Sequence, residues 1–351
     1  MKVVRRAFGV LLGFVFFSAG FLKLMDPVGA GLSMEAYLHF FRLDFLREAA
    51  KALAVTAAMG ETLLGAALLT GVWRKTVGVL TACVLAAFTL LTAILWMGNP
   101  AMDCGCFGEA IHLTHTQTFL KNLVLCGLWA LAFLPLRATG TCKRIKYAGF
   151  GLAAVSVCLF CLYSLLSIPM VDFTAFRPGN ELLRPDGDTL QAEGAPLLSF
   201  CDAAQNYADE RATDGKVLIV SVYDTGRMTA AAWERIATLF EKAQEADLTP
   251  LLLLAGSVEE ADAIGNPVLQ SCCYFADRRS LMGLNRSNGG ATYVDNGLIV
   301  AKWAARALPD RGRLQALAGQ DAAAALIDGN TPSRLRLQGF LLYVFAVMLL
   351  L

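Results

Sequence analysis

The chain has 351 residues, of which 56% are hydrophobic and only 17% are charged. This balance lies outside the usual range of soluble globular proteins and predicts several membrane-spanning segments. The lipid bilayer is therefore an expected partner. The net charge is +1 and no basic face interleaved with aromatic residues is present, which argues against nucleic acid as a partner.

The N-terminus predicts an uncleaved membrane span. Residues 1–6 are basic, residues 7–25 are apolar, and no convincing small-residue cleavage site follows them, which argues against a signal peptide. Further apolar runs predict spans at residues 53–71, 77–98, 119–136 and 147–168. The apolar tail at residues 338–351 is shorter than the roughly 20 residues that a helical span needs, so its topology stays open.

The distribution of Lys and Arg predicts the orientation in the membrane. The N-terminus, the turn at residues 72–76 and the loop at residues 137–146 are basic, whereas residues 99–118 contain no Lys or Arg. The segment 26–52, predicted as a loop, carries balanced charges. By the positive-inside rule, the N-terminus is cytoplasmic in a bacterial inner membrane, and residues 99–118 and 170–335 are periplasmic.

A two-cysteine turn lies between two of the apolar runs. Residues 103–108 read Asp-Cys-Gly-Cys-Phe-Gly, so one glycine separates Cys104 from Cys106. A disulfide between them closes a tight ring, and strained disulfides are labile and exchange readily. We therefore predict thiol–disulfide chemistry at the periplasmic face, with Cys104 and Cys106 as the redox pair.

Two charged residues within or beside the spans are candidates for a supporting role. Glu61 lies inside an apolar run, where a carboxylate is costly and is usually paired or functional. Lys23 lies near the periplasmic end of the first span, where its stem can reach the interface. Glu61 is predicted to pair with Lys23 near the dithiol or to relay a proton when a thiol is oxidised. A structural polar contact between helices is the alternative.

The order and spacing of four stretches resemble a known family. These stretches are residues 17–27, 60–65, 103–108 and 118–122. Through them, residues 1–136 resemble the DoxX/MauE family of small membrane proteins. The resemblance implies a bundle of four membrane helices. It also implies electron transfer or disulfide formation outside the cytoplasm, as in methylamine utilisation, where methylamine dehydrogenase is matured. The chain would then be a thiol–disulfide oxidoreductase or an accessory subunit of one.

The fifth span contributes a second cysteine pair. Cys158 and Cys161 form a Cys-x-x-Cys on one helix face, a pattern that quinone-coupled disulfide enzymes such as vitamin K epoxide reductase also place on a membrane helix. Cysteine is equally an ordinary small apolar residue in a span. A membrane quinone is the cofactor that this pattern suggests.

Two other interpretations of the cysteine turn stay open. Cys104, Cys106, His112 and His115 supply ligand types suited to zinc or copper over a short loop. This ligand set predicts zinc or copper binding as the alternative function of the membrane protein. A third interpretation is a non-catalytic scaffold in which Cys104 and Cys106 form only a structural disulfide.

The sequence predicts a periplasmic α/β domain over residues 170–335. Residues 137–169, which precede it, are predicted to form a cytoplasmic loop and the fifth span, and residues 336–351, which follow it, a hydrophobic segment. Strands are expected at 216–223, 250–255, 273–276, 291–294 and 299–303, with helices at 229–246, 258–264, 280–284 and 311–326. This alternation resembles a thioredoxin-like domain. The positions of the thioredoxin Cys-x-x-Cys and cis-proline are occupied by residues 224–227 and 289–292, so an ordinary thioredoxin site is missing.

The adjacent Cys272 and Cys273 are secondary redox candidates in this domain. A disulfide between these neighbours would be strained and labile. Alternatively, both thiols are buried at the start of a strand. A third possibility is that Cys272 or Cys273 pairs with Cys201. The backbone around residues 286–290 is a candidate for binding an extended peptide. A periplasmic thiol or disulfide protein is the expected partner.

Overall fold

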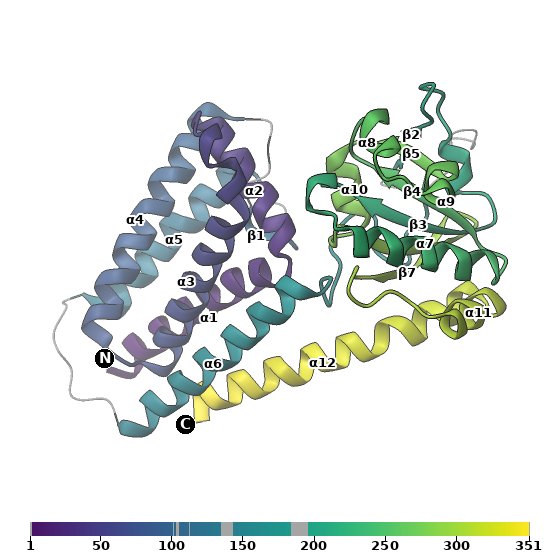
Figure 1. Ribbon diagram of the computed structural model, residues 1–351. Helices are drawn as coiled ribbons and strands as arrows, with labels where there is room; N and C mark the ends of the chain where they lie inside the picture. The colour runs from purple at the N-terminus through teal and green to yellow at the C-terminus, as the bar shows by residue number, and fades with distance from the viewer. Residues whose placement is uncertain are drawn as a thin grey trace. The chain divides into compact units, whose positions relative to one another are not determined.

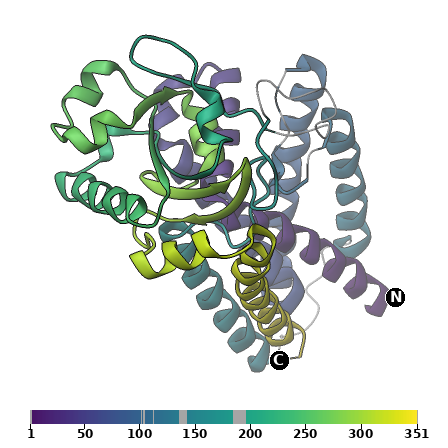
Figure 2. The same ribbon diagram turned by 90° about the vertical axis from the view of Figure 1, so that its right-hand side faces the viewer.

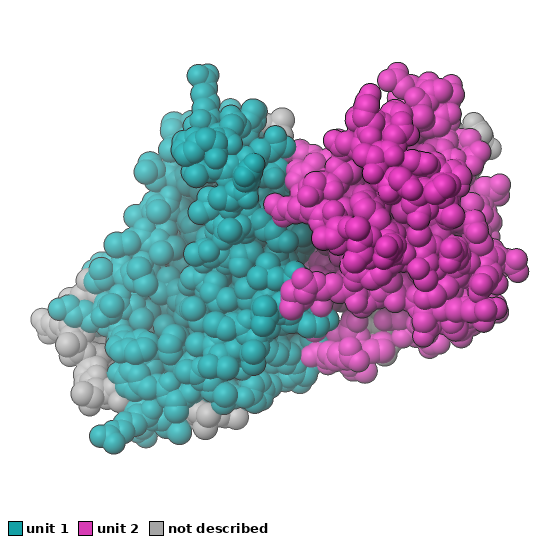
Figure 3. All heavy atoms as spheres, in the orientation of Figure 1, with its two compact units in different colours: residues 1–165, 337–351 teal, residues 166–336 magenta. Residues whose placement is uncertain are grey.

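The computed structural model describes residues 2–100, 102, 105–111, 113–134, 143–183 and 196–350. The chain divides into two compact units (Figure 3). The membrane unit comprises residues 1–165 and 337–351, and the sheet unit comprises residues 166–336.

The membrane unit is built almost entirely from helices (Figure 1). These are α1 (Lys2–Met25), α2 (Pro27–Phe40), α3 (Ala50–Thr70), α4 (Arg74–Gly98), α5 (His115–Phe133), α6 (Arg144–Leu166) and the end of α12 (Ala322–Leu350). The 3-10 helix η1 (Asp44–Ala49) precedes α3, and the short strand β1 (Cys106–Glu109) follows α4 in the sequence.

Four described segments are long and apolar enough to cross a membrane. They are Val3–Met25, Asp44–Thr70, Arg74–Gly98 and Arg144–Leu166, and they overlap four of the predicted spans. The span predicted at residues 119–136 falls on α5, which is not among these four. The first two turns of α5 carry His115, Lys121 and Asn122, and these polar side chains lower its hydropathy.

The prediction of a loop over residues 26–52 was wrong, because this segment folds into α2 and η1. Asp26 caps α2 by accepting a hydrogen bond from the Gly29 nitrogen at 2.9 Å, and Pro27 lies at the first helical position. Asp followed by Pro is a helix-start signal. The helix packs against α3 and β1, and so forms one wall of the site described below.

The sheet unit contains a six-stranded mixed sheet with the order β2-β5-β4-β3-β6-β7. The strands are β2 (Phe200–Cys201), β3 (Lys216–Val222), β4 (Thr249–Leu254), β5 (Cys273–Ala276), β6 (Gly290–Asp295) and β7 (Leu298–Trp303). β3, β4 and β5 run parallel, whereas β2, β6 and β7 are antiparallel to their neighbours. The helices are η2 (Asp209–Ala212), η3 (Thr225–Arg227), α7 (Ala230–Gln244), α8 (Val258–Asp262), α9 (Pro267–Ser271), α10 (Arg278–Leu284), α11 (Arg311–Gly319) and the start of α12.

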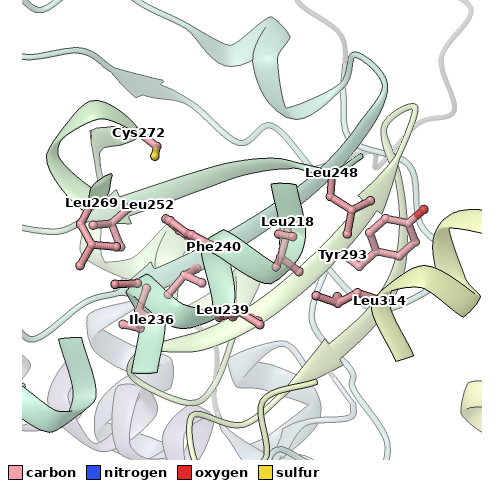
Figure 4. Packing of buried hydrophobic residues seen from close by; sticks show 14 of the residues in the cluster. Leu218, Ile236, Leu239, Phe240, Leu248, Leu252, Leu269, Cys272, Tyr293 and Leu314 are labelled. Carbon is pink, nitrogen blue, oxygen red and sulfur yellow. The ribbon is translucent and has the colours of Figure 1, made fainter. Parts of the chain in front are cut away.

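Helices cover both faces of this sheet (Figures 1 and 2). On one face, α7, α9 and α11 pack on Leu218 and Leu252 of the central strands through residues such as Phe240 and Leu314 (Figure 4). On the other face, α10 packs on the alternate strand residues, such as Ile219. Because successive strand side chains point to opposite faces, strands covered on both sides are continuous apolar runs in the sequence.

The strands and helices predicted between residues 216 and 303 occur close to their predicted positions. The two-residue strand β2 at the sheet edge was not predicted. A mixed sheet with helices on both faces is therefore observed, and the thioredoxin-like identity of the domain stays a prediction.

The C-terminal part differs from its prediction in two ways. The single helix predicted at residues 311–326 is interrupted after Gly319, and α12 starts afresh at Ala322. α12 then continues to Leu350, so the tail is the end of a 29-residue helix rather than a separate short segment. The apolar stretch at the end of this helix is still short, and α12 is not among the candidate membrane spans found in the described part of the chain.

The tail packs into the membrane unit through aromatic rings. The Phe340 ring lies 5.9 Å from the Phe21 ring and 5.1 Å from the Phe160 ring, centroid to centroid. The Phe345 ring lies 5.1 Å from the Phe17 ring. The end of α12 therefore contacts α1 and α6.

Candidate functional site

Glycines bring α1 and α3 into backbone contact. A Cβ atom on Gly20 would lie 2.4 Å from the nearest atom of α3, and one on Gly65 would lie 2.3 Å from the Phe17 nitrogen. These positions leave no room for a side chain, and small residues at helix contacts are typical of membrane bundles. The close approach brings the long side chains of Lys23 and Glu61 within reach of each other.

Lys23 and Glu61 form a buried ion pair. The Lys23 Nζ donates hydrogen bonds to the two Glu61 carboxylate oxygens at 2.8 Å and 2.9 Å. Glu61 is 6% exposed and Lys23 is 17% exposed. Charges removed from water are tolerated when each is paired and hydrogen-bonded by the other. The pair therefore keeps an ammonium and a carboxylate inside an otherwise apolar bundle.

Cys106 lies at the start of β1 in a tight turn. The Gly108 nitrogen donates to the Gly105 carbonyl at 3.1 Å, and these two glycines have φ angles of +61° and +57°, which glycine adopts without strain. A Cβ atom on Gly105 would lie 3.0 Å from the Ser33 Cβ of α2, so the turn is held closely against that helix. Cys106 is half-buried there. Cys104, its predicted redox partner, lies outside the described residues.

Lys23, Glu61 and Cys106 line one cavity of about 310 Å³. Its walls come from α1, α2, α3, α4, α5 and the turn that precedes β1. Most of the lining is apolar, and the further polar side chains on it are Ser33, Tyr37, Thr92, Lys121 and Asn122. An apolar pocket with a few convergent polar groups is the usual form of a small-molecule site.

Lys121 and Asn122 are site residues that sequence reasoning did not assign. The Lys121 Nζ lies 4.8 Å from the centroid of the Phe107 ring. Phe107 directly follows Cys106 in the sequence. The Asn122 Nδ2 donates to the Thr92 Oγ1 at 3.1 Å. The sequence did contain a signal for them, because Lys121 and Asn122, like Glu61, are polar residues within a predicted span. Ser33 and Tyr37 were missed because α2 was predicted as a loop.

Only part of the alternative metal-ligand set falls on the described residues. Cys106 and His115 are described, whereas Cys104 and His112 lie outside. His115 begins α5, is buried, and its Nε2 lies 3.0 Å from the Pro100 carbonyl oxygen. Among the described residues, no group of three or more His, Cys, Asp or Glu side chains is arranged to hold a metal ion. The metal hypothesis therefore gains no geometric support from this part of the chain.

Cys158 and Cys161 lie one turn apart on α6. Cys158 is exposed and Cys161 is buried. Neither is among the described residues that line the cavity. A redox role for this pair stays a prediction with no structural link to Cys106.

The three cysteines of the sheet unit are free thiols. The Cys272 Sγ donates to the Val268 carbonyl at 2.9 Å, and Cys201 lies on β2 beside β5. Burial, with smaller contributions from Cys272 and Asp262, raises the pKa of Cys273 to about 12, and burial also raises the pKa of Cys272. Both thiols are therefore protonated at neutral pH, and protonated thiols are poor nucleophiles.

The loops at one end of the central strands are tied together by Asn288. Its Oδ1 accepts hydrogen bonds from the Tyr223 and Asp224 nitrogens at 2.9 Å and 3.0 Å. The backbone nitrogens of Gly289 and Gly290 also donate within the unit, each at 2.8 Å. In the region suggested for peptide binding, these two amides are already hydrogen-bonded inside the domain.

Comparison with known proteins found a family match for the first part of the chain. Residues 1–135 match the family model described as methylamine utilisation protein MauE. The match spans α1 to α5 and includes Lys23, Glu61, Cys106 and Lys121. Searches of curated proteins and of solved structures found no match. Over residues 1–135, the chain is therefore similar to the MauE family of membrane proteins.

Proposed function

We propose that the membrane unit transfers electrons from the Cys104–Cys106 dithiol to a membrane quinone in the cavity, and so drives disulfide formation in a periplasmic protein. One observation carries this proposal. Cys106 shares a mainly apolar cavity of about 310 Å³ with the Lys23–Glu61 ion pair. This volume is at the lower end of the range of about 300–1,000 Å³ that is usual for small-molecule sites.

The proposed exchange is balanced without a further reagent. Oxidation of the two thiols forms the Cys104–Cys106 disulfide and releases two electrons and two protons. The quinone takes up two electrons and two protons and leaves as the quinol. A client dithiol then attacks the disulfide through a mixed disulfide, which regenerates the two thiols and leaves a disulfide in the client.

The charged groups of the cavity suit this chemistry. The Glu61 carboxylate can accept a proton released by a thiol, and the paired Lys23 ammonium holds that carboxylate in a fixed place. Lys121 adds a second ammonium to the cavity wall. Cations in a site that excludes water stabilise the negative charge that develops on sulfur or on a quinone oxygen during the reaction.

The sheet unit is proposed to hold the client rather than to exchange electrons. Two of its three cysteines have pKa values raised by burial. Residues 224–227, where a thioredoxin-like sequence would be expected to carry its dithiol, contain an Asp224–Arg227 ion pair and no cysteine. A domain of this kind can position a protein substrate while the chemistry takes place at Cys104 and Cys106.

The first test is the redox state of Cys104 and Cys106 in the purified full-length protein. Thiol trapping in defined glutathione buffers should show a reversible couple well above about −300 mV, the upper edge for structural disulfides. Metal analysis of the same sample separates the alternatives. A bond that resists reduction would indicate a structural disulfide, and untrappable thiols with stoichiometric zinc or copper would establish the metal site instead.

The second test addresses proton transfer by Glu61. The reduced protein is mixed with a water-soluble quinone, and quinol formation is followed by absorbance. We expect Glu61→Gln to slow this reaction by about a hundredfold, as is typical when a general acid–base group is lost. The matched control is Glu48→Gln, which removes an exposed carboxylate of η1 that does not line the cavity. An unchanged rate in Glu61→Gln would refute the relay and leave the ion pair as a structural contact.

A further inference from the structure

The membrane unit has a second cavity, of about 620 Å³, whose described lining is strongly basic. Five cationic side chains from three parts of the chain converge on it, namely Arg6 of α1, Arg74 and Lys75 of α4, and Lys143 and Lys146 at the start of α6. No Asp or Glu is among the described lining residues. A cavity of this charge attracts an anion.

The cations at this end of the bundle are crowded. The Arg5 Nε and the Arg74 Nη2 both donate to one acceptor, the Ala132 carbonyl, at 3.2 Å and 2.9 Å. In addition, α4 and α6 begin with basic residues and have no acidic residue in the first turn. Because the N-terminus of a helix carries a partial positive charge, cations there are unfavourable, and an anion between the two helix starts relieves the repulsion.

The apolar part of the lining suits a lipid. Leu68, Val72 and Phe133 line the cavity together with the charged side chains. Trp73 is 51% exposed and Tyr147 is 37% exposed, and their rings meet edge to face with centroids 5.3 Å apart. Exposed Trp and Tyr at the ends of spans are typical of the membrane–water interface.

The positions of the spans place the cavity at the same level as lipid headgroups. One candidate span ends at Thr70, and two others begin at Arg74 and Arg144, all in or next to the cavity lining. Basic pockets between membrane helices at such a level bind anionic lipid headgroups.

We propose that this cavity binds the phosphate headgroup of an anionic phospholipid, with the cations around the phosphate and the acyl chains against the apolar lining. The inference does not depend on the proposed redox function. A free phosphate ion shares the charge chemistry, but it would make no use of the apolar lining or of the exposed aromatic pair.

The test measures binding of phosphatidylglycerol, in phosphatidylcholine vesicles, to the purified full-length protein. We expect the double variant Lys75→Gln/Lys146→Gln to bind about thirtyfold more weakly and each single variant about fivefold more weakly, since each cation near the surface contributes similarly. Lys75→Arg/Lys146→Arg keeps the charge and should keep the affinity. The control Arg42→Gln removes an exposed cation that does not line the cavity and should have no effect on binding.

Three results would overturn the proposal. The first is wild-type affinity in the double variant. The second is equal binding to vesicles with and without phosphatidylglycerol. The third is displacement of the lipid by inorganic phosphate at the same concentration, which would identify a soluble anion as the ligand. If the double variant fails to fold in neutral lipid, the single variant Lys75→Gln is tested instead. Lys75 is exposed, so its replacement should not disturb folding.

Discussion

Among the described residues, each unit contains a buried pair of a lysine and a carboxylate, and the two pairs have different surroundings. Lys23 and Glu61 are 17% and 6% exposed at 2.8 Å, and Lys302 and Asp172 are 5% and 14% exposed at 2.6 Å. The first pair lines the cavity beside Cys106. The second pair joins the segment after α6 to β7 and lines neither of the two cavities.

This difference shows that burial and pairing do not by themselves indicate function. Both pairs satisfy the same electrostatic requirement, since a buried charge needs a partner. What distinguishes Lys23–Glu61 is space for a ligand together with a cysteine on the same cavity wall. The cysteines follow the same division, because Cys106 lines that cavity whereas Cys273 is held as a protonated thiol at the start of a strand.

The largest effect is expected for Lys302→Met. The substitution keeps the shape of the side chain but leaves the Asp172 carboxylate buried without its cation, and breaking a buried pair in this way costs about 3–5 kcal/mol. The free energy of unfolding of the sheet unit, measured by urea titration with pulse proteolysis of the full-length protein, should fall by that amount.

Arg311→Gln is the matched control for that substitution. Arg311 and Glu245 form an ion pair at 2.9 Å with 57% and 51% of their side chains exposed. Exposed pairs contribute only about 0–1 kcal/mol, so the unfolding free energy should change by less than that. Equal losses in the two variants would show that the Lys302–Asp172 pair has no special structural importance.

The sequence allowed some of the site to be predicted because the relevant signals are local. The cost of a charge in an apolar run singles out Glu61, and the single glycine between two cysteines draws attention to Cys106, and both residues line the cavity. The strands of the sheet unit were predictable for the same reason, since unbroken apolar runs such as residues 216–222 are characteristic of doubly covered strands.

The rest depends on contacts between distant parts of the chain. The cavity is formed by six elements, and its shape follows from the close packing of α1 on α3 at Gly20 and Gly65, which no local pattern reveals. The wall contributed by α2 was missed because the balanced charges of residues 26–52 favoured a loop over the helix-start signal at Asp26.

A second prediction tests the division between the cysteines. Because the folded pKa of Cys273 is about 12 and an ordinary thiol has a pKa of about 8.5, the thiolate fraction near pH 8 is about a thousandfold lower in the folded protein. Iodoacetamide should therefore label Cys273 about a thousandfold more slowly in the native protein than in urea, as followed by mass spectrometry.

The sign of the pH dependence follows from the raised pKa. The folded state keeps the Cys273 proton after the unfolded state has lost it, so the contribution to stability is complete below about pH 8.5 and is lost as the pH rises toward the folded value. Cys273→Ser should remove this residue's contribution to the pH dependence of the unfolding free energy. Native labelling as fast as that of the unfolded chain would show an accessible thiol and reopen a redox role for the sheet unit.

The smallest effect concerns the glycine contact that shapes the cavity. In Gly65→Ala the new Cβ atom would lie 2.3 Å from the Phe17 nitrogen, so α1 and α3 must separate. Overpacking of this kind costs about 1–3 kcal/mol, measured as a lower unfolding temperature in detergent. Gly60→Ala on the same helix is the control, because no atom lies within 4 Å of its Cβ position. There we expect a gain of up to about 1 kcal/mol from helix propensity. If both variants behaved alike, the close packing of α1 on α3 would not be what holds Lys23 against Glu61.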